Sequence, residues 1–320
     1  MAHPNQTKAA REIVKAFRGG NQYVMLTAQM QSGKTGTFQT VAKMMLAVGL
    51  VERVFIISGS NEVELLEQAR ADTVKFNPEE VAAGKIKVIF RQHFSATVAF
   101  ELRKTLVIVE ESHLDQSNGQ QMDKFLKRMG LSLNGELPTP TTYILSVSAT
   151  PFSEYSALTY NKSASKEEVK LVPAASYRGV KYFLENNLIK EVFDISSSRF
   201  GDLVRQHCAK PGNYKYCIVR TTDAKMRDIV SKYSRVFDIR YFLQDKKTIS
   251  IADMETAPAK PTIVFLKGLL RCGKVVPKAH IGFVWEGTKK PKTDTALQGL
   301  LGRMCGYYAD GPAAAAASAR

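Results

Sequence analysis

The chain has 320 residues, 44% of them hydrophobic, which is enough for two domains that each bury a core. Lysine and arginine outnumber the acidic residues by 45 to 30, giving a net charge of +15 and a pI near 9.6. This basic excess favours a polyanionic partner such as nucleic acid, and no apolar run of about 18 residues offers a membrane span. The four cysteines are far apart and form no C-x-x-C pair, which argues against zinc and a disulfide framework and favours a reducing compartment.

The first apolar run of the chain, residues 23–26, leads through a short loop into a helical pattern over 38–50. The loop reads A-Q-M-Q-S-G-K-T, and a strand, a loop ending in G-K-T and a helix form the layout of a phosphate-binding P-loop. Backbone N–H groups of such a loop and the helix dipole favour negative charge at this point. We therefore expect the phosphates of a nucleotide to be held by Gln31, Ser32, Gly33, Lys34 and Thr35.

Two side chains of this loop have specific expected roles. Lys34 would reach the β- and γ-phosphates, and the Thr35 hydroxyl would bind Mg²⁺. Ala28 stands where the usual pattern has its first glycine. The alternative interpretation is an ordinary strand-to-helix turn in which Lys34 is a solvated surface residue.

Apolar runs of strand length alternate with helical patterns along the rest of the chain. This alternation predicts an α/β fold with mostly parallel sheets flanked by helices. A stretch richer in Ser, Ala, Lys and Tyr interrupts the alternation and predicts a connection between two lobes. The predicted strands lie at 54–58, 86–90, 105–109 and 143–147 in the first lobe and at 216–219, 237–242, 262–266 and 280–285 in the second. The predicted organisation is a first lobe over 1–155, a connecting segment over 156–190, a second lobe over 191–310, and a linker, tag or tail over 311–320.

Two adjacent acids, Glu110 and Glu111, follow the apolar run 105–109. Ligands of open α/β sheets bind at the carboxyl ends of the strands, so both acids are expected beside the nucleotide. Glu110 is a candidate Mg²⁺ ligand, and Glu111 is a candidate for orienting or deprotonating the attacking water. Without a P-loop upstream, a solvated acidic pair at a strand end would be the simpler interpretation.

Two further motifs contribute candidate residues. S-A-T-P at 148–151 follows a predicted strand, and the hydroxyls of Ser148 and Thr150 are suited to hydrogen bonds that link the acids to a neighbouring lobe. A simple turn before proline is the alternative. Near the C-terminus a helical pattern runs into Gly302 and Arg303. An arginine supplied by a second lobe neutralises charge that develops on the γ-phosphate, whereas a structural arginine is the alternative for Arg303.

Four motifs in this order, Q-S-G-K-T, E-E-S-H, S-A-T and Q-x-x-x-G-R, resemble the motor core of superfamily 2 helicases and translocases. The E-E-S-H motif looks like the D-E-x-H box of that family. More narrowly, Y-R-G-V-K-Y-F at 177–183, L-K-G-L-L-R-C-G-K-V-V-P-K at 266–278 and G-R-M-C-G-Y resemble helicase-like proteins of phages and large DNA viruses. The resemblance implies two RecA-like lobes that bind ATP and Mg²⁺ between them.

The resemblance also implies roles for individual residues at the nucleotide. Gln6 looks like the glutamine that reads adenine in many of these motors. Glu110 stands where the family usually has a magnesium-binding aspartate, and Glu111 where it has the catalytic acid. Arg303 looks like the arginine finger. Gly268 belongs to the motif that contacts both the nucleotide and the nucleic-acid backbone.

Coupling and nucleic-acid contacts follow from the same resemblance. Ser148 and Thr150 would couple hydrolysis to movement of the lobes. Contacts to the phosphate backbone position a strand without reading its sequence, and ordinary polar turns are the alternative for each of them. The residues expected to make these contacts are Ser58, Gly59, Asn61, Arg91, Thr221 and Thr222.

Three positions depart from the family pattern. Glu110 replaces an aspartate, which adds a methylene and would shift the metal or require a bridging water. The second arginine of G-R-x-G-R is absent, and Cys305 and Gly306 occupy that region. The spacing from Gln298 to Gly302 is one residue longer than in the common form. These departures bear on the rate of hydrolysis more than on the fold.

The leading function hypothesis is an ATP-dependent nucleic-acid motor, a helicase or translocase, with single-stranded or duplex DNA favoured over RNA. The alternative is a nucleotide-gated nucleic-acid clamp or regulatory subunit with weak hydrolysis, which the departures at Glu110 and Cys305 motivate. A small-molecule phosphotransferase is disfavoured because it explains neither Arg303 nor the charge of +15. ATP and Mg²⁺ are the expected cofactors. We expect no membrane partner, a cytoplasmic location (that of the host if the protein is viral), and room for further protein subunits.

Overall fold

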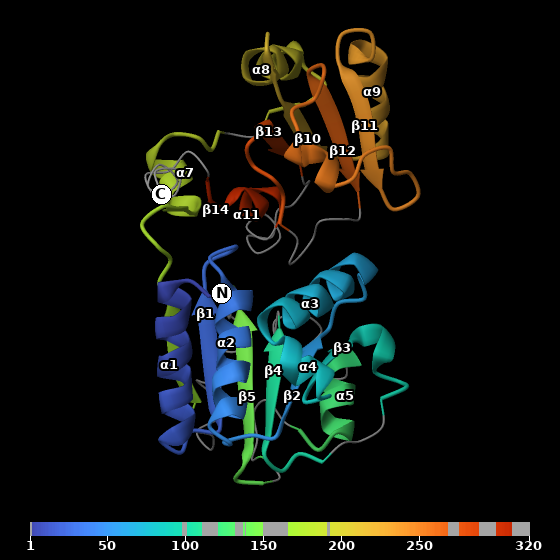
Figure 1. Ribbon diagram of the computed structural model, residues 1–320. Coiled ribbons are helices and arrows are strands. Elements are labelled where there is room, and N and C mark those ends of the chain that lie inside the picture. Colours follow the sequence, from blue (N-terminus) through green and yellow to red (C-terminus); the bar gives the residue numbers. More distant parts are fainter. Residues whose placement is uncertain are drawn as a thin grey trace. The chain divides into compact units, whose positions relative to one another are not determined.

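The computed structural model describes residues 2–97, 101–110, 121–131, 137, 139–149, 166–190, 193–267, 275–287 and 299–308. The chain divides into two compact units, Met1–Ala174 and Ala175–Arg320. Each unit contains its own parallel sheet flanked by helices, which confirms the predicted α/β class (Figure 1). Within the described ranges, no helix has the length and apolar character that crossing a membrane requires.

The first unit is built on a six-stranded parallel sheet in the order β3-β2-β4-β5-β1-β6. Its strands are β1 (Tyr23–Ala28), β2 (Arg53–Ser58), β3 (Ile86–Phe90), β4 (Thr105–Glu110), β5 (Thr142–Ser148) and β6 (Lys166–Leu171). Its helices are α1 (Pro4–Arg18), α2 (Lys34–Ala47), α3 (Val63–Phe76), α4 (Pro78–Ala82) and α5 (Gln121–Arg128), together with the 3-10 turn η1 (Arg91–His93).

Helices cover both faces of this sheet, as near-continuous apolar strands require. One face packs against α1 and α2 through buried residues that include Phe17 and Phe38. The other face packs against α5 through residues that include Phe125. Successive strand residues point to opposite faces, so Leu106 of β4 belongs to the first cluster and Val107 to the second. Two cores therefore hold the sheet and fix the ends of its strands.

Strand β6 lies within the segment 156–190, which the sequence predicts to be a connection between two lobes. It pairs in parallel with the whole of β1, and its buried side chains are Val169 and Leu171. An edge strand has a single neighbour and a solvent-facing side, so charged residues alternate with apolar ones and no apolar run marks it. The later part of the same segment supplies the first elements of the second unit.

The second unit contains a four-stranded parallel sheet in the order β11-β12-β10-β13 and two short two-stranded sheets. Its strands are β7 (Tyr177–Arg178), β8 (Ala209–Lys210), β9 (Asn213–Tyr214), β10 (Tyr216–Arg220), β11 (Asp238–Leu243), β12 (Thr262–Lys267), β13 (Ile281–Glu286) and β14 (Gly306–Tyr307). Its helices are α7 (Val180–Glu185), α8 (Ser198–Cys208), α9 (Asp223–Tyr233) and α11 (Leu300–Met304), with the 3-10 turn η2 (Ala252–Glu255).

The larger sheet of the second unit also has two buried faces. Phe200 of α8 and Ile229 of α9 pack on one face. Met254 of η2 and Leu300 of α11 pack on the other. Helix α11 is therefore anchored to the sheet by its first residue, and this anchoring matters because the helix carries the predicted arginine finger.

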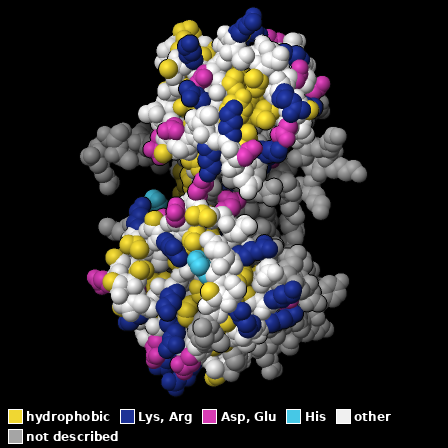
Figure 2. Space-filling view, turned by 90° about the vertical axis from the view of Figure 1, so that its right-hand side faces the viewer, with side chains coloured by type: hydrophobic (Ala, Val, Ile, Leu, Met, Phe, Trp, Pro, Cys, Tyr) yellow, Lys and Arg dark blue, Asp and Glu magenta, His cyan; other side chains and the backbone are white. Residues whose placement is uncertain are grey.

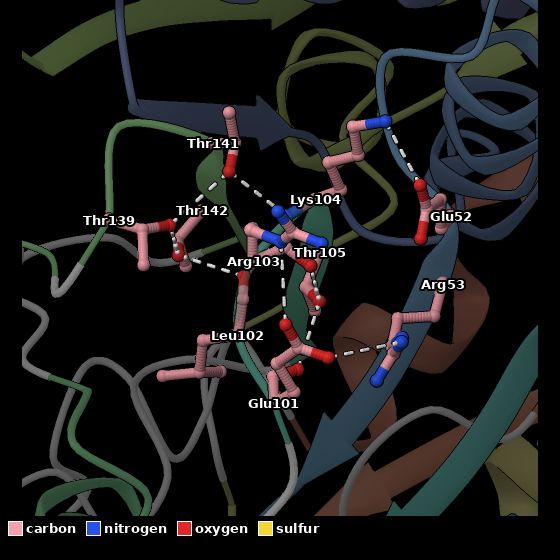
Figure 3. Close-up of polar contacts among 10 residues, drawn as sticks. All are labelled: Glu52, Arg53, Glu101, Leu102, Arg103, Lys104, Thr105, Thr139, Thr141 and Thr142. Carbon is pink, nitrogen blue, oxygen red and sulfur yellow. Dashed lines mark hydrogen bonds and ion pairs between the residues drawn. The ribbon is translucent and has the colours of Figure 1, made fainter.

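A polar network joins the amino ends of strands in the first sheet (Figure 3). The phosphate loop follows the carboxyl end of β1, at the opposite end of the strands. Lys104 pairs with Glu52 across 3.0 Å and donates its backbone N–H to the hydroxyl of Thr141 at 3.0 Å. Glu101 forms ion pairs with Arg53 and Arg103, with N–O distances of 3.6 and 3.4 Å. The network joins the starts of β2, β4 and β5. The candidate nucleotide site lies at the carboxyl ends of the strands.

Candidate nucleotide-binding site

The predicted phosphate loop forms a compact turn between β1 and α2. Gln31 and Gly33 have positive φ angles of 55° and 108°, and a left-handed conformation of this kind favours glycine. Ser32 is fully buried, and both its hydroxyl and its backbone N–H donate to the carbonyl of Gln29, at 2.7 and 3.2 Å. The loop is therefore held in one shape by its own hydrogen bonds.

Helix α2 begins at Lys34, directly after this turn. The Thr37 N–H donates to the Gly33 carbonyl at 3.2 Å and is the first such bond of the helix. The backbone N–H groups just before Thr37 therefore lie in the first turn, where a helix leaves its N–H groups without an intrahelical acceptor. That end carries the positive pole of the helix dipole, which favours a phosphate. The side chains of Lys34 and Thr35 are half-buried at the same end.

Gln6 of α1 packs directly against the phosphate loop. Its Nε2 donates to the Gly33 carbonyl at 3.1 Å, and its Oε1 accepts from the His3 N–H at 2.7 Å. A Cβ at Gly33 would lie 2.2 Å from Nε2, and a Cβ at Gly36 would lie 2.6 Å from Oε1. Both glycines thus leave space for the Gln6 amide, which joins α1 to the phosphate loop.

The carboxyl ends of the strands bring other predicted residues to the same edge of the sheet. Glu110 ends β4 and lies in register with Ser58 of β2. Ser148 ends β5, is fully buried, and lies in register with Thr27 of β1 just before the loop. Since β5 lies between β1 and β4, Ser148 stands between the phosphate loop and Glu110. Glu111, Thr150 and Gly268 lie outside the described residues.

The donor set at this edge suits a hard cation shared with phosphates. Mg²⁺ is usually bound by one or two protein oxygens together with phosphate oxygens and water. The Thr35 hydroxyl and the Glu110 carboxylate are oxygen donors of this kind. Among the described residues there is no group of three or more His, Cys, Asp or Glu side chains that would hold a metal by itself.

The predicted nucleic-acid contacts divide by exposure. Ser58 and Gly59 are buried, and the Ser58 hydroxyl accepts from the Ser60 N–H at 3.3 Å. Asn61 and Arg91 are exposed, and the Arg91 N–H bonds to the Ser60 carbonyl at 3.2 Å, so the turns after β2 and β3 lie together. In the second unit, the Thr222 hydroxyl accepts from the Lys225 N–H at 3.5 Å and caps α9, while Thr221 is half-buried beside it.

Arg303 lies on α11 of the second unit and is only 6% exposed. The charge of Arg303 acts on Lys278. Burial lowers the pKa of the Lys278 ammonium to about 8, Cys305 opposes that shift, and the charge of Arg303 adds to it. Burial also raises the pKa of the Cys305 thiol. The surroundings of Arg303 are therefore partly desolvated and cationic, which suits binding of an anion.

Gly36 in the first unit and Glu286 in the second each have a clear structural role that the sequence motifs did not reveal. Gly36 makes room for Gln6, and a glycine inside a helix, where it costs stability, was the available signal. Glu286 bonds to α11, as described below, and its signal was an acid that directly follows an apolar strand. Neither position belongs to the four motifs that carry the resemblance.

Comparisons with known proteins place the fold. No protein-family model matches the chain. A variant of S. cerevisiae Dbp5 bound to RNA and ADP–BeF3 is similar in structure, with a TM-score of 0.52 and 14% identity over 94% of this chain and 84% of that one. The DEAD-box helicase Mss116 bound to ssRNA and UDP–BeF has a TM-score of 0.50 and 12% identity over 81% and 60%. An uncharacterized protein of Acanthamoeba polyphaga mimivirus is 24% identical over 95% of this chain and 82% of its own length. The fold is that of two RecA-like lobes, as in helicase cores.

Proposed function

We propose that this protein is an ATP-dependent nucleic-acid motor of the superfamily 2 type. The observation that carries the proposal is the strand–loop–helix unit of β1 and α2, in which Gly33 adopts the left-handed turn and Gln6 packs against it. The likeness to helicase cores supports the same function at the level of the fold. The net charge of +15 supports a polyanionic partner.

The proposal assigns a role to each group at the nucleotide. The amino end of α2 and Lys34 hold the phosphates, while Thr35 and Glu110 hold Mg²⁺, which supplies charge neutralisation on the phosphates when bound. Glu111 orients the attacking water and takes its proton. Gln6 reads the base from α1, and Gly268 contacts the nucleotide from the second unit.

The remaining roles concern the second unit and the nucleic acid. Arg303 neutralises charge that develops on the γ-phosphate. Ser148 and Thr150 transmit the state of the nucleotide to the movement of the lobes. The phosphate backbone is contacted by residues at the strand ends, namely Ser58, Gly59, Asn61, Arg91, Thr221 and Thr222.

The experiment that tests this function is the rate of ATP hydrolysis measured alone and with single-stranded DNA, duplex DNA and RNA. We expect hydrolysis to require Mg²⁺ and to rise when the preferred nucleic acid is added, with DNA preferred. Hydrolysis that no nucleic acid stimulates would contradict the motor. A rise with RNA alone would keep the motor and reverse the proposed partner.

A second candidate is a nucleotide-gated clamp with weak hydrolysis. It is favoured by Glu110 in the place of an aspartate and by Cys305 and Gly306 in the place of a second arginine. A clamp would bind ATP and change its affinity for nucleic acid without turnover. Measuring nucleic-acid affinity with ATP and without nucleotide, beside the hydrolysis rate, distinguishes the two functions.

A further inference from the structure

A largely buried ion pair joins the ends of two neighbouring strands in the second unit. Arg220 at the end of β10 and Glu286 at the end of β13 lie in register, and their Nη1 and Oε1 atoms are 2.5 Å apart. Their side chains are only 19% and 14% exposed. The Gly287 N–H also bonds to the Arg220 carbonyl at 3.2 Å, so backbone and side chains fix the same point.

The second oxygen of Glu286 reaches the helix that carries Arg303. Oε2 accepts from the Leu300 N–H at 2.7 Å, and Leu300 is the first residue of α11. A carboxylate that accepts a backbone N–H forms a charge-assisted hydrogen bond, and its negative charge suits a helix start. One carboxylate thus connects two strand ends to the first turn of α11.

Gly299 makes this contact sterically possible. A Cβ at Gly299 would lie 2.3 Å from Oε2 and 2.5 Å from Oε1 of Glu286. The Gly299 carbonyl accepts from the Arg303 N–H at 3.2 Å, which closes the first turn of the helix. The path from the ion pair to the Arg303 backbone therefore consists of two hydrogen bonds, the second of which closes the first turn of α11.

We propose that Glu286, held by Arg220, is a positioning residue that fixes the start of α11 and through it the approach of Arg303 to the γ-phosphate. The proposal rests on the proposed function, because Arg303 needs a transferring phosphate to act on. A merely structural ion pair would stabilise the second unit without affecting turnover by the folded protein. The two interpretations differ in kcat, in the coupling to Arg303 and in local exchange at α11.

The test uses the full chain and three single variants. Glu286→Gln keeps an oxygen that accepts from Leu300 but loses the charge that pairs with Arg220. Gly299→Ala keeps both partners and crowds their contact. Asp202→Asn is the control, since it removes the charge of an exposed ion pair with Arg205 in the same unit. For each variant we would measure kcat and KM for ATP with nucleic acid present, together with the melting temperature.

Glu286→Gln and Gly299→Ala are expected to lower kcat by about tenfold, with KM for ATP changed less than about twofold, because α11 contributes to the transferring phosphate rather than to ground-state binding. Amide exchange at Leu300 should become faster in Glu286→Gln, and Asp202→Asn should behave as wild type. Normal kcat per folded molecule in both test variants would overturn the proposal. That result would not contradict the proposed ATP hydrolysis, which both variants would still perform.

A double-mutant cycle with Arg303→Ala separates this proposal from the proposed function. If Glu286 acts through Arg303, adding Glu286→Gln to Arg303→Ala lowers kcat little further. Effects that multiply in full would show that Glu286 acts elsewhere, and they would overturn the positioning role while Arg303 keeps its own. If Arg303→Ala alone hydrolyses normally, the arginine-finger assignment fails and the positioning role fails with it.

Discussion

Gly36 lies in the first turns of α2, where glycine costs roughly 0.5–1 kcal/mol relative to alanine. The close approach of the Gln6 amide explains why this cost is tolerated, because any larger residue would meet that amide. Gly36 thus leaves the space that the Gln6 amide occupies, and Gln6 is the residue proposed to read the base. The contact is local, so it is tested by substitutions that leave the phosphate loop in place.

Gly36→Ala is expected to displace the Gln6 amide and to lower the preference for ATP over GTP, with KM for ATP raised severalfold. Thermal stability should change little, because the helix gains from alanine what the displaced hydrogen bonds lose. The measurement is KM for ATP and GTP in Gly36→Ala and in Gln6→Ala, with melting temperatures on the same preparations. Unchanged selectivity in both variants would remove Gln6 from the base-reading role.

Lys34→Ala is expected to abolish hydrolysis and weaken nucleotide binding, since it removes the cation at the amino end of α2. Lys43→Ala is the matched control because Lys43 is an exposed lysine on the same helix. Turnover and nucleotide affinity are measured for both variants. Wild-type turnover in Lys34→Ala would refute the P-loop assignment.

Glu111→Gln is expected to bind ATP without hydrolysing it, because the amide no longer takes a proton from the attacking water while Glu110 still provides a metal ligand. The readout is retained nucleotide after gel filtration together with the rate of phosphate release. Glu110→Gln is the comparison and should weaken Mg²⁺-dependent binding instead. The reverse pattern would mean that the two acids have exchanged roles.

At the scale of elements, the sequence predicted the central strands well because each is a buried apolar run. β2, β4 and β5 were predicted to within a residue or two of their ends. β6 was not predicted, because an edge strand is only partly buried and its charged residues break the apolar run that marks a central strand. Glu286 is marked in the sequence only as an acid after an apolar strand, whereas its contact with α11 spans fourteen residues along the chain and its pairing with Arg220 depends on the register of β10 and β13.

The neighbourhood of α11 gives a prediction about stability and pH. Lys278 has a pKa of about 8 in the folded protein, mainly because of burial, against an ordinary value of 10.5. Between these values the unfolded chain binds more protons, so this lysine makes the free energy of unfolding rise with pH. Below pH 8, burial of the charged Lys278 lowers the free energy of unfolding by its full amount.

Lys278→Met should therefore be more favourable relative to wild type at pH 7 than at pH 10. The measurement is chemical unfolding of both proteins across this range, and the difference between them isolates this lysine from tyrosines and cysteines that titrate in the same window. Lys210→Met, an exposed position in the same unit, is the control. A difference between wild type and Lys278→Met that stays constant with pH would contradict the assigned shift.

At the scale of the whole molecule, the sequence carries a net charge of +15, and one face of each unit shows how part of it is arranged. On the face of each unit that Figure 2 shows, lysine and arginine side chains are spread over the surface and interleaved with acidic ones. The sequence gives the sign and size of the net charge, +15, but not its arrangement, which depends on the fold. A net positive charge of this size attracts a polyanion, and contacts to phosphates position a strand without reading its sequence.

Nucleic-acid binding should consequently show little sequence preference and a steep dependence on salt. If about six or more phosphates are contacted, affinity falls by roughly three orders of magnitude between 50 and 200 mM salt, because each contact releases condensed counterions. Affinity is measured for several unrelated sequences of equal length across this range, with ATP binding as the internal comparison. Nucleotide binding releases no counterion atmosphere of this kind, so its salt slope should be much shallower. Equal slopes for both ligands, or a strong preference for one sequence, would mean that the charge of the protein is not what holds the strand.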